Sequence, residues 1–223
     1  MVVALDGPAG AGKSSVSRRV AELAGFAWLN SGSFYRAVTW AVLQQGADPA
    51  DREAVVRIAR AVLLSLDGEG GVTVDGRSVE HLLRSDAVDT WVARHSAIGE
   101  VRAAVNQRLR EIAASGRDVV VDGRDIATVV FPDAEVKVYL DADVATRARR
   151  RHAQGTSRMT LEEIGRSIAD RDRFDRGKAE APLAVAPGAL LLDTSHLTIE
   201  EVCERVLDAI HDKRLTPGDK RQV

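Results

Sequence analysis

The stretch "GPAGAGKSS" near the start of the chain matches the pattern G-x-x-x-x-G-K-[ST] over residues 7–14. Such a turn points successive backbone amides at an anion, and the helix expected after it adds the positive end of its dipole. We therefore expect a bound nucleoside polyphosphate, with Lys13 on its β- and γ-phosphates and the Ser14 hydroxyl on Mg²⁺. The expected nucleotide contacts are Gly7, Pro8, Ala9, Gly10, Ala11, Gly12, Lys13, Ser14 and Ser15.

A second group of charged residues follows the apolar run "VVVDG". Asp122 ends this run, and a carboxylate at such a strand end often holds the water shell of Mg²⁺ in phosphate-loop proteins. Arg124 and Asp125 come directly after it and can bind a second ligand through charge and hydrogen bonds. A solvated loop pair is the alternative interpretation of these two residues.

Five arginines lie within twelve residues in "RARRRHAQGTSR", residues 147–158. A solvated helix face and a nucleic-acid patch are two interpretations, but the patch lacks aromatic partners and a basic chain around it. We favour a mobile lid, because residues 155–157 break the helical pattern in its middle. Arginines that arrive on closure would stabilise the charge of a transferring phosphoryl group. The candidates are Arg149, Arg151 and Arg158.

A third charged cluster is "RDRFDRGKAEAPL", which begins at residue 171. Arg171 and Asp175 are four positions apart and share one face of a helix. A surface salt-bridge face is one interpretation, and a face that binds a second phosphorylated ligand is the one we favour. The histidines are scattered and none stands beside a nucleophile motif, which suits phosphoryl transfer because that reaction needs no covalent nucleophile on the protein.

The elements that must position these residues follow an alternating pattern. Five short apolar runs, "MVVALD", "FAWLN", "DVVVDG", "EVKVYLD" and "ALLLDT", predict buried strands, and segments of helical period separate them. This alternation predicts a parallel sheet with helices on both faces. One region, residues 34–97, interrupts it and contains a predicted hairpin over residues 71–79 that turns on Asp75 and Gly76.

Composition limits the class of protein. The chain has 223 residues, 45% of them hydrophobic and 29% charged, which predicts a folded core rather than disorder. Its net charge of −2 gives no global field for nucleic acid or an anionic membrane, and no apolar stretch is long enough to span a bilayer. The single cysteine, Cys203, excludes an internal disulfide and is expected to be buried. We expect a cytoplasmic monomer that binds neither membrane nor nucleic acid.

Together, "DGPAGAGKSS", "LNSGSFYR", "VDGRDIATVVFPDAEVKVYLDA" and "RDRFDRGKAEAPL" strongly resemble the bacterial cytidylate kinases, in the same order along the chain. The resemblance implies the α/β fold of the phosphate-loop nucleoside monophosphate kinases: a five-stranded parallel core, a lid and an enlarged insert that binds the monophosphate. The expected boundaries are residues 1–33, 98–145 and 166–212 for the core, 34–97 for the insert, 146–165 for the lid and 213–223 for a frayed tail.

The resemblance also implies the reaction, in which ATP and CMP or dCMP give ADP and CDP or dCDP with Mg²⁺. Ser31 and Asp175 resemble the pair that binds the sugar hydroxyls, with Arg171 close by. Arg36 and Arg124 resemble the arginines that clamp the α-phosphate of the acceptor. Phosphoryl transfer would then proceed by in-line attack, through positioning and charge stabilisation rather than through a strong general base.

Asp125 and Arg102 resemble the residues that read the edge of cytosine. A carboxylate accepts from the exocyclic amino group of cytosine, whereas the carbonyl that uracil has there would be repelled. Two positions depart from the family pattern: Ala93 stands where a serine commonly contacts the base, with Ser96 three residues later, and Lys178 replaces a phosphate-binding arginine. A lysine keeps the charge but loses the bidentate fork.

Two other classes of function stay open at this point. One is a kinase of the same fold that acts on AMP, UMP or a small metabolite. The other is a nucleotide-dependent switch or scaffold that binds ATP without a small-molecule acceptor. The second charged cluster and the arginine-rich segment favour an enzyme over a switch, and Asp125 with Arg102 favours CMP over other monophosphates.

Overall fold

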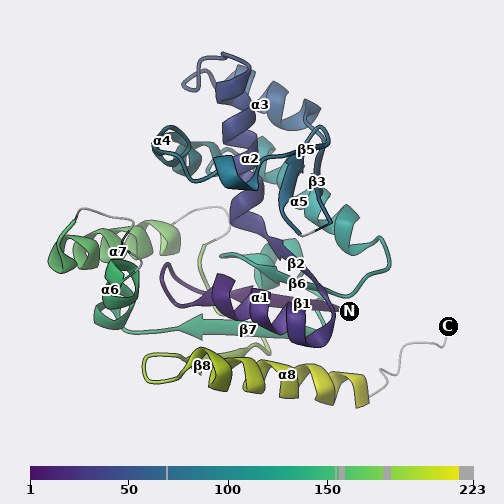
Figure 1. Cartoon of the computed structure of the whole chain (residues 1–223), viewed down its shortest axis with the longest axis vertical. Coiled ribbons are helices and arrows are strands. Elements are labelled where there is room, and N and C mark those ends of the chain that lie inside the picture. Colours follow the sequence, from purple (N-terminus) through teal and green to yellow (C-terminus); the bar gives the residue numbers. More distant parts are fainter. Residues whose placement is uncertain (69, 154, 156–158, 178–181, 216–223) are drawn as a thin grey trace. The chain divides into compact units, whose positions relative to one another are not determined.

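A computed structural model describes residues 1–68, 70–153, 155, 159–177 and 182–215. The chain forms two compact units (Figure 1). Unit 1 consists of Met1–Trp28 together with Asp118–Val223, and unit 2 of Leu29–Arg117. Each unit is described below by itself. None of the helices within the described ranges is long and apolar enough to cross a membrane.

A five-stranded sheet with the strand order β2-β6-β1-β7-β8 forms the centre of unit 1. The strands are β1 (Val2–Asp6), β2 (Ala27–Asn30), β6 (Val119–Asp122), β7 (Val136–Asp141) and β8 (Leu190–Asp193). β1 pairs in parallel with both β6 and β7, and β7 pairs in parallel with β8. The predicted parallel α/β sheet is therefore confirmed, and the carboxyl ends of β1 and β6 lie next to each other in the register Leu5 to Asp122.

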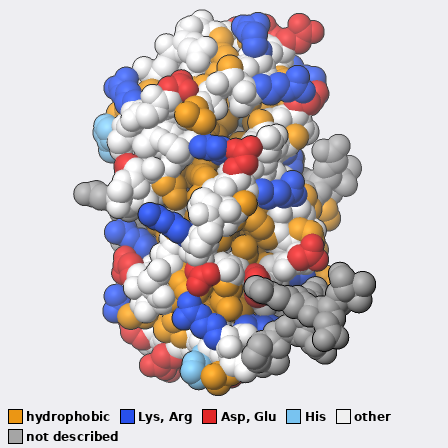
Figure 2. Space-filling model, turned by 90° about the vertical axis from the view of Figure 1, so that its right-hand side faces the viewer, with side chains coloured by type: hydrophobic (Ala, Val, Ile, Leu, Met, Phe, Trp, Pro, Cys, Tyr) orange, Lys and Arg blue, Asp and Glu red, His pale blue; other side chains and the backbone are white. Residues whose placement is uncertain are grey.

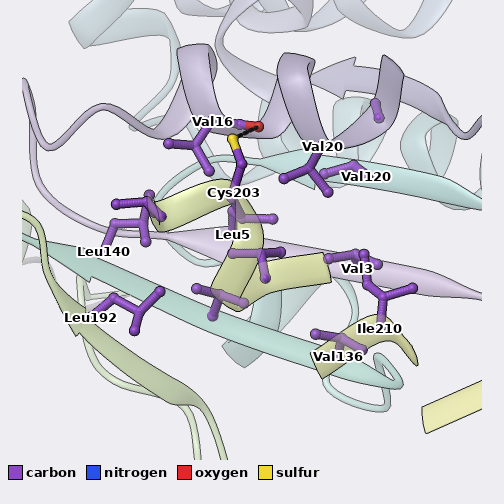
Figure 3. Close-up of a cluster of buried hydrophobic side chains, with 14 of the residues drawn as sticks. Val3, Leu5, Val16, Val20, Val120, Val136, Leu140, Leu192, Cys203 and Ile210 are labelled. Carbon is purple, nitrogen blue, oxygen red and sulfur yellow. Dashed lines mark hydrogen bonds between the residues drawn. The ribbon is translucent and has the colours of Figure 1, made fainter. Parts of the chain in front are cut away.

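The core of unit 1 lies between this sheet and two helices, α1 (Lys13–Ala24) and α8 (Ile199–Leu215), which also contact each other. Figure 3 shows apolar side chains of all these elements meeting, among them Val3, Val16 and Leu140. Cys203 belongs to the same cluster, and its thiol lies 3.9 Å from the carbonyl oxygen of Val16. Burial raises the pKa of this thiol, and the expectation of a buried cysteine is confirmed.

Two helices of unit 1, α6 (Val144–Ala153) and α7 (Leu161–Arg176), carry charged residues singled out above and pack against each other. Arg124 and Asp125 directly precede a single π-helical turn, η2 (Ile126–Val130). The α7 helix begins with a capping box, in which the Thr160 side chain accepts from the amide of Glu163 and the Glu163 carboxylate accepts from the amide of Thr160. This cap fixes where α7 starts and so the register of its charged residues.

Unit 2 contains four α-helices, a short 3₁₀ turn and a small antiparallel sheet of order β3-β4-β5 within its described residues. The predicted hairpin is confirmed as β4 and β5, and Asp75 and Gly76 both have positive φ, 51° and 79°, as a type I′ turn requires. The elements are α2 (Ser31–Gln44), α3 (Arg52–Ala61), β3 (Leu64–Leu66), β4 (Val72–Val74), β5 (Arg77–Ser78), η1 (Glu80–Leu82), α4 (Asp86–His95) and α5 (Gly99–Ala113).

The boundaries of unit 2 include the predicted insert, residues 34–97, and extend beyond it on both sides. In particular, α5 groups with unit 2, although it was assigned to the core from the sequence. The functional boundaries of insert, lid and tail stay predictions. On the molecular face in Figure 2, Lys and Arg side chains are interspersed with Asp and Glu, in keeping with the small net charge of −2.

Candidate active site

The phosphate loop, residues 7–15, leaves the carboxyl end of β1 and leads into α1. Gly7 has φ 148°, and a Cβ atom there would lie 2.0 Å from the backbone oxygen of Leu140. Only glycine therefore lets the loop approach β7 so closely. Gly12 precedes α1 with φ 92°, a left-handed conformation that aims the first amides of the helix into the loop.

The side chain of Lys13 is hydrogen-bonded to the backbone of this loop. Its Nζ donates to the carbonyl oxygen of Pro8 at 2.8 Å, and the residue is only 9% exposed. Burial lowers the pKa of Lys13 to about 7, and the positive charges of Arg124 and Arg171 contribute in the same direction. An anion bound in the loop would replace the solvation that the ammonium group has lost, and the assignment of Lys13 to a phosphate stays a prediction.

Asp122 lies at the carboxyl end of β6, next to the first turn of α1. Its Oδ2 accepts from the Ser14 hydroxyl at 2.8 Å, and its Oδ1 accepts from Ser17 and from the indole of Trp28. Burial raises the pKa of this carboxyl, while the hydrogen bonds from Ser14, Trp28 and Ser17 and the charge of Lys13 oppose that rise. Ser17 and Trp28 were not identified from the sequence, because neither belongs to a motif.

The donor set of Ser14 and Asp122 fits Mg²⁺. This ion prefers oxygen ligands, uses one or two protein side chains together with substrate phosphates, and keeps several waters. A hydroxyl and a carboxylate oxygen lie 2.8 Å apart beside the phosphate loop and supply two such oxygens. Within the described ranges, no group of three or more His, Cys, Asp or Glu side chains could hold a metal.

Arg124 connects the phosphate loop with the charged face of α7. Its Nη1 donates to the carbonyl oxygen of Gly7 at 3.0 Å, and its Nε lies 3.5 Å from Oδ2 of Asp175. Arg171 approaches the same carboxylate oxygen from α7 at 4.0 Å. Three residues that the sequence assigned to a second ligand are thus brought together beside the loop, and burial lowers the pKa of Arg124.

Asp6, which no motif singled out for chemistry, holds the segment that follows Arg124. Its two carboxylate oxygens accept from the backbone amides of Ile126 at 2.8 Å and Ala127 at 2.7 Å, at the start of η2. The residue is 2% exposed, and burial raises its pKa to about 6, with a smaller contribution from the charge of Asp125. These two hydrogen bonds fix the backbone directly after Asp125, a buried residue that is predicted to read the base.

The role of Arg147 was also not identified from the sequence. It was counted within the arginine-rich segment, yet it is 2% exposed and fully engaged. Its guanidinium donates to the carbonyl oxygens of Ala142 at 2.8 Å and Ala9 at 3.1 Å, and pairs with Asp172 at 2.6 Å. Arg147 therefore joins the phosphate loop to α7. The available signal was its position one residue before Ala148 on the apolar face of α6.

The predicted lid arginines lie elsewhere on the same helix. Arg149 and Arg151 are exposed, and Arg149 donates to the Thr146 hydroxyl at 2.6 Å. Arg150 instead binds Thr194, which precedes α8, at 3.0 Å between Nη1 and Oγ1. Arg158 and Lys178 lie outside the described residues. The assignment of a lid stays a prediction.

Three predicted substrate residues belong to unit 2. Ser31 begins α2 and is buried, and Arg36 on the same helix donates to the carbonyl oxygen of Leu83 at 3.0 Å and pairs with Asp89 at 2.6 Å. The guanidinium of Arg102 on α5 lies 5.9 Å from the ring centre of Tyr35. Each of these side chains is thus supported inside its own unit.

The departure at Ala93 has a defined local geometry. Ala93 is an exposed residue of α4, and the hydroxyl of Ser96 donates to its carbonyl oxygen at 3.0 Å. A hydroxyl does occur near this position, therefore, but it is bonded to the backbone of its own helix end.

Comparisons with known proteins agree with one another. The model of the family "Cytidylate kinase" matches residues 3–212. A cytidylate kinase of Caldanaerobacter subterraneus subsp. tengcongensis is 44% identical over 220 residues, 97% of this chain and 96% of that protein. One of Mycolicibacterium paratuberculosis is 42% identical over 219 residues and 96% of each chain.

The comparison with solved structures supports the fold and nothing further. An uncharacterized protein of Eubacterium ventriosum is 10% identical, with a TM-score of 0.54 and coverage of 95% of this chain and 98% of that one. The family match spans nearly the whole sequence and includes the phosphate loop, the segment from Asp122 to Asp125 and the charged face of α7. This chain belongs to the cytidylate kinase family.

Proposed function

We propose that this protein transfers the γ-phosphoryl group of ATP to CMP or dCMP, giving ADP and CDP or dCDP. The observation that carries the proposal is the position of Arg124, which binds the phosphate loop at Gly7 and lies 3.5 Å from Asp175 on α7. Arg124 thereby joins the phosphate loop to residues that we propose bind a second ligand, which supports a transfer between two bound molecules. The family match supports the identity of the acceptor.

In this proposal the protein accelerates the reaction by positioning the two substrates and by stabilising the charge of the transferring phosphoryl group. Lys13 and the loop amides hold the β- and γ-phosphates of ATP, and arginines neutralise the charge of the phosphoryl group in flight. The acceptor phosphate is already an anion at neutral pH and attacks in line, so no strong general base is required. Ser14 and Asp122 would hold Mg²⁺, which supplies charge neutralisation and orients the phosphates when bound.

The proposal for the acceptor assigns one role to each group of residues. Arg36 and Arg124, with Lys178, bind the α-phosphate of CMP, and Ser31 and Asp175, with Arg171 nearby, bind the sugar hydroxyls. Asp125 and Arg102 read the edge of the base, because a carboxylate accepts from the amino group of cytosine and faces a carbonyl in uracil.

The remaining assignments are proposed in the same way. Residues 34–97 form the insert that binds the monophosphate, and residues 146–165 form a lid that closes over the phosphates with Arg149, Arg151 and Arg158. Closure would exclude water and so suppress hydrolysis of ATP. The protein acts as a monomer in the cytoplasm.

The test is coupled release of ADP from Mg·ATP with CMP, dCMP, UMP, AMP and GMP offered separately. We expect strong activity with CMP and dCMP and weak activity with UMP. Preference for another monophosphate would refute the assignment of Asp125 and Arg102, and ADP release without any monophosphate would favour a nucleotide-dependent switch.

A matched pair of variants tests base recognition within this assay. Asp125→Ala should lower kcat/KM for CMP far more than for UMP, because only cytosine loses a hydrogen bond. Asp133→Ala changes an exposed aspartate eight positions further along and should leave the ratio of CMP to UMP activity unchanged.

A further inference from the structure

The carboxylate of Asp122 is fixed by two donors that lie outside the phosphate loop. Its Oδ1 accepts from Nε1 of Trp28 at 2.8 Å and from Oγ of Ser17 at 2.9 Å. The same indole nitrogen lies 2.9 Å from Oγ of Ser17, so the three polar atoms form a closed triangle. Ser17 is 0% exposed and Asp122 is 3% exposed, which shields these bonds from competition with water.

This triangle determines how the carboxylate of Asp122 is oriented. Oδ1 has two donors, whereas Oδ2 lies 2.8 Å from the Ser14 hydroxyl at the edge of the loop. A carboxylate held at one oxygen cannot turn about its Cβ–Cγ bond without breaking both bonds. Its orientation toward Ser14 is therefore set before any ligand arrives.

We propose that Trp28 and Ser17 are positioning residues for Mg²⁺, which hold Oδ1 of Asp122 so that Oδ2 faces the water shell of an ion bound at the Ser14 hydroxyl. The inference rests on the proposed function, which assigns Ser14 and Asp122 to Mg²⁺. Groups that orient a metal-binding carboxylate typically change metal affinity or activity by about 10–100-fold when they are removed.

A purely structural role for Trp28 makes a different prediction. Its ring packs against the core of unit 1, and the guanidinium of Arg18 lies 5.9 Å from the ring centre. If the ring only filled space, its replacement would lower stability and would weaken nucleotide binding equally with and without Mg²⁺. The ratio of the two affinities separates the two roles.

The experiment measures the affinity for ADP by calorimetry, once with Mg²⁺ and once with EDTA, in the absence of CMP. Trp28→Phe keeps most of the ring and removes the N–H donor, and Ser17→Ala removes the hydroxyl with little change in volume. We expect each variant to reduce the affinity ratio about tenfold while the affinity in EDTA stays near that of the wild type. Trp91→Phe changes a tryptophan of α4 and should leave the ratio unchanged.

A second readout uses the indole itself. In a protein with Trp40→Phe and Trp91→Phe, Trp28 is the remaining tryptophan, because the chain has three. Mg²⁺ added to the ADP complex should then change the emission of Trp28, and Asp122→Asn should abolish that change. Neither readout requires turnover.

The results distinguish a failure of this inference from a failure of the proposed function. If CMP is not phosphorylated but the affinity ratio falls in both variants, the function is wrong and the positioning role stands. If Asp122→Asn lowers the ratio while Trp28→Phe and Ser17→Ala keep the wild-type value, the inference is overturned and the function stands.

Discussion

Two charged regions of unit 1 differ in how their charges are held. The charged residues around the phosphate loop are buried, and each forms a hydrogen bond within the protein: Lys13, Asp6 and Asp122. On the outer side of α6, Arg149 and Arg151 are exposed. A buried charge needs a partner within the folded protein, because it has lost its solvation by water. An exposed charge is solvated and needs no partner until a ligand binds. The first region is therefore built before the nucleotide arrives.

This difference separates the effects of mutation. A change to a buried residue should alter folding stability and activity together, except at Lys13, where burial opposes the charge that is lost. A change on the exposed face should alter activity alone. Arg147 is the informative case, since it belongs to α6 by sequence and to the buried region by its contacts. The predictions below run from the largest expected effect to the smallest.

Lys13→Met should reduce kcat by about 10⁴-fold, because it removes the cation that stabilises the transferring phosphoryl group. The same change should not destabilise the nucleotide-free protein, since burial lowers the pKa of Lys13 to about 7 and so opposes its charge. Steady-state kinetics and urea unfolding measure the two effects. Lys213→Met, in the last turn of α8, is the control, and activity of Lys13→Met within tenfold of the wild type would contradict the mechanism.

Arg147→Ala should lower the free energy of unfolding by about 3–5 kcal/mol, because it leaves Asp172 buried without its partner. A variant with Leu at both positions should recover part of that loss, since it removes both charges. Urea unfolding measures the free energy of unfolding of each variant. The exposed pair of Arg166 and Glu162, with 69% and 81% of their side chains accessible, is the control and should show no measurable change. Equal losses of unfolding free energy for the buried and the exposed pair would contradict the difference proposed between the two regions.

Arg149→Ala and Arg151→Ala should each lower kcat by about 10²-fold if these arginines reach the phosphates on closure. The midpoint of urea unfolding should stay unchanged, because both side chains are exposed in the nucleotide-free protein. Arg205→Ala removes an exposed arginine of α8 and serves as the control. A loss of stability without a loss of rate would assign these arginines to the fold instead.

Asp6 should leave a signature in the pH dependence of stability. Its pKa is about 6 in the folded protein against an ordinary value of 3.8, so the folded state binds the extra proton between these values. The contribution is present at low pH and is lost as the pH rises through 6. Relative to Asp6→Asn, the wild type should therefore lose about 2 kcal/mol of unfolding free energy between about pH 4.5 and 7.5. Parallel curves for the two proteins would contradict this.

The sequence was a good guide wherever the information is local. The phosphate loop is a contiguous motif, and the hairpin turns on two adjacent residues. Parallel strands were predictable as well, because a strand buried on both faces is a continuous apolar run. Each of these signals lies within a few residues of the element that it specifies.

Contacts between distant segments were not predictable in this way. Asp6 meets amides 120 and 121 positions away, and Arg147 meets a carbonyl oxygen 138 positions away. Every backbone amide and carbonyl looks alike in a sequence, so nothing marks which one a buried side chain will find. Trp28 was missed because its partner, the side chain of Asp122, lies 94 positions further along the chain and no local pattern links the two.

The bond from Asp6 to η2 also bears on how this region can change during evolution. Both of its donors are backbone amides, so the bond does not depend on which side chains stand at positions 126 and 127. Their apolar side chains can drift with the surrounding core. Proline is the exception, since it has no amide hydrogen to donate. The loop that carries Asp125 can therefore vary in sequence while its backbone keeps one anchored path.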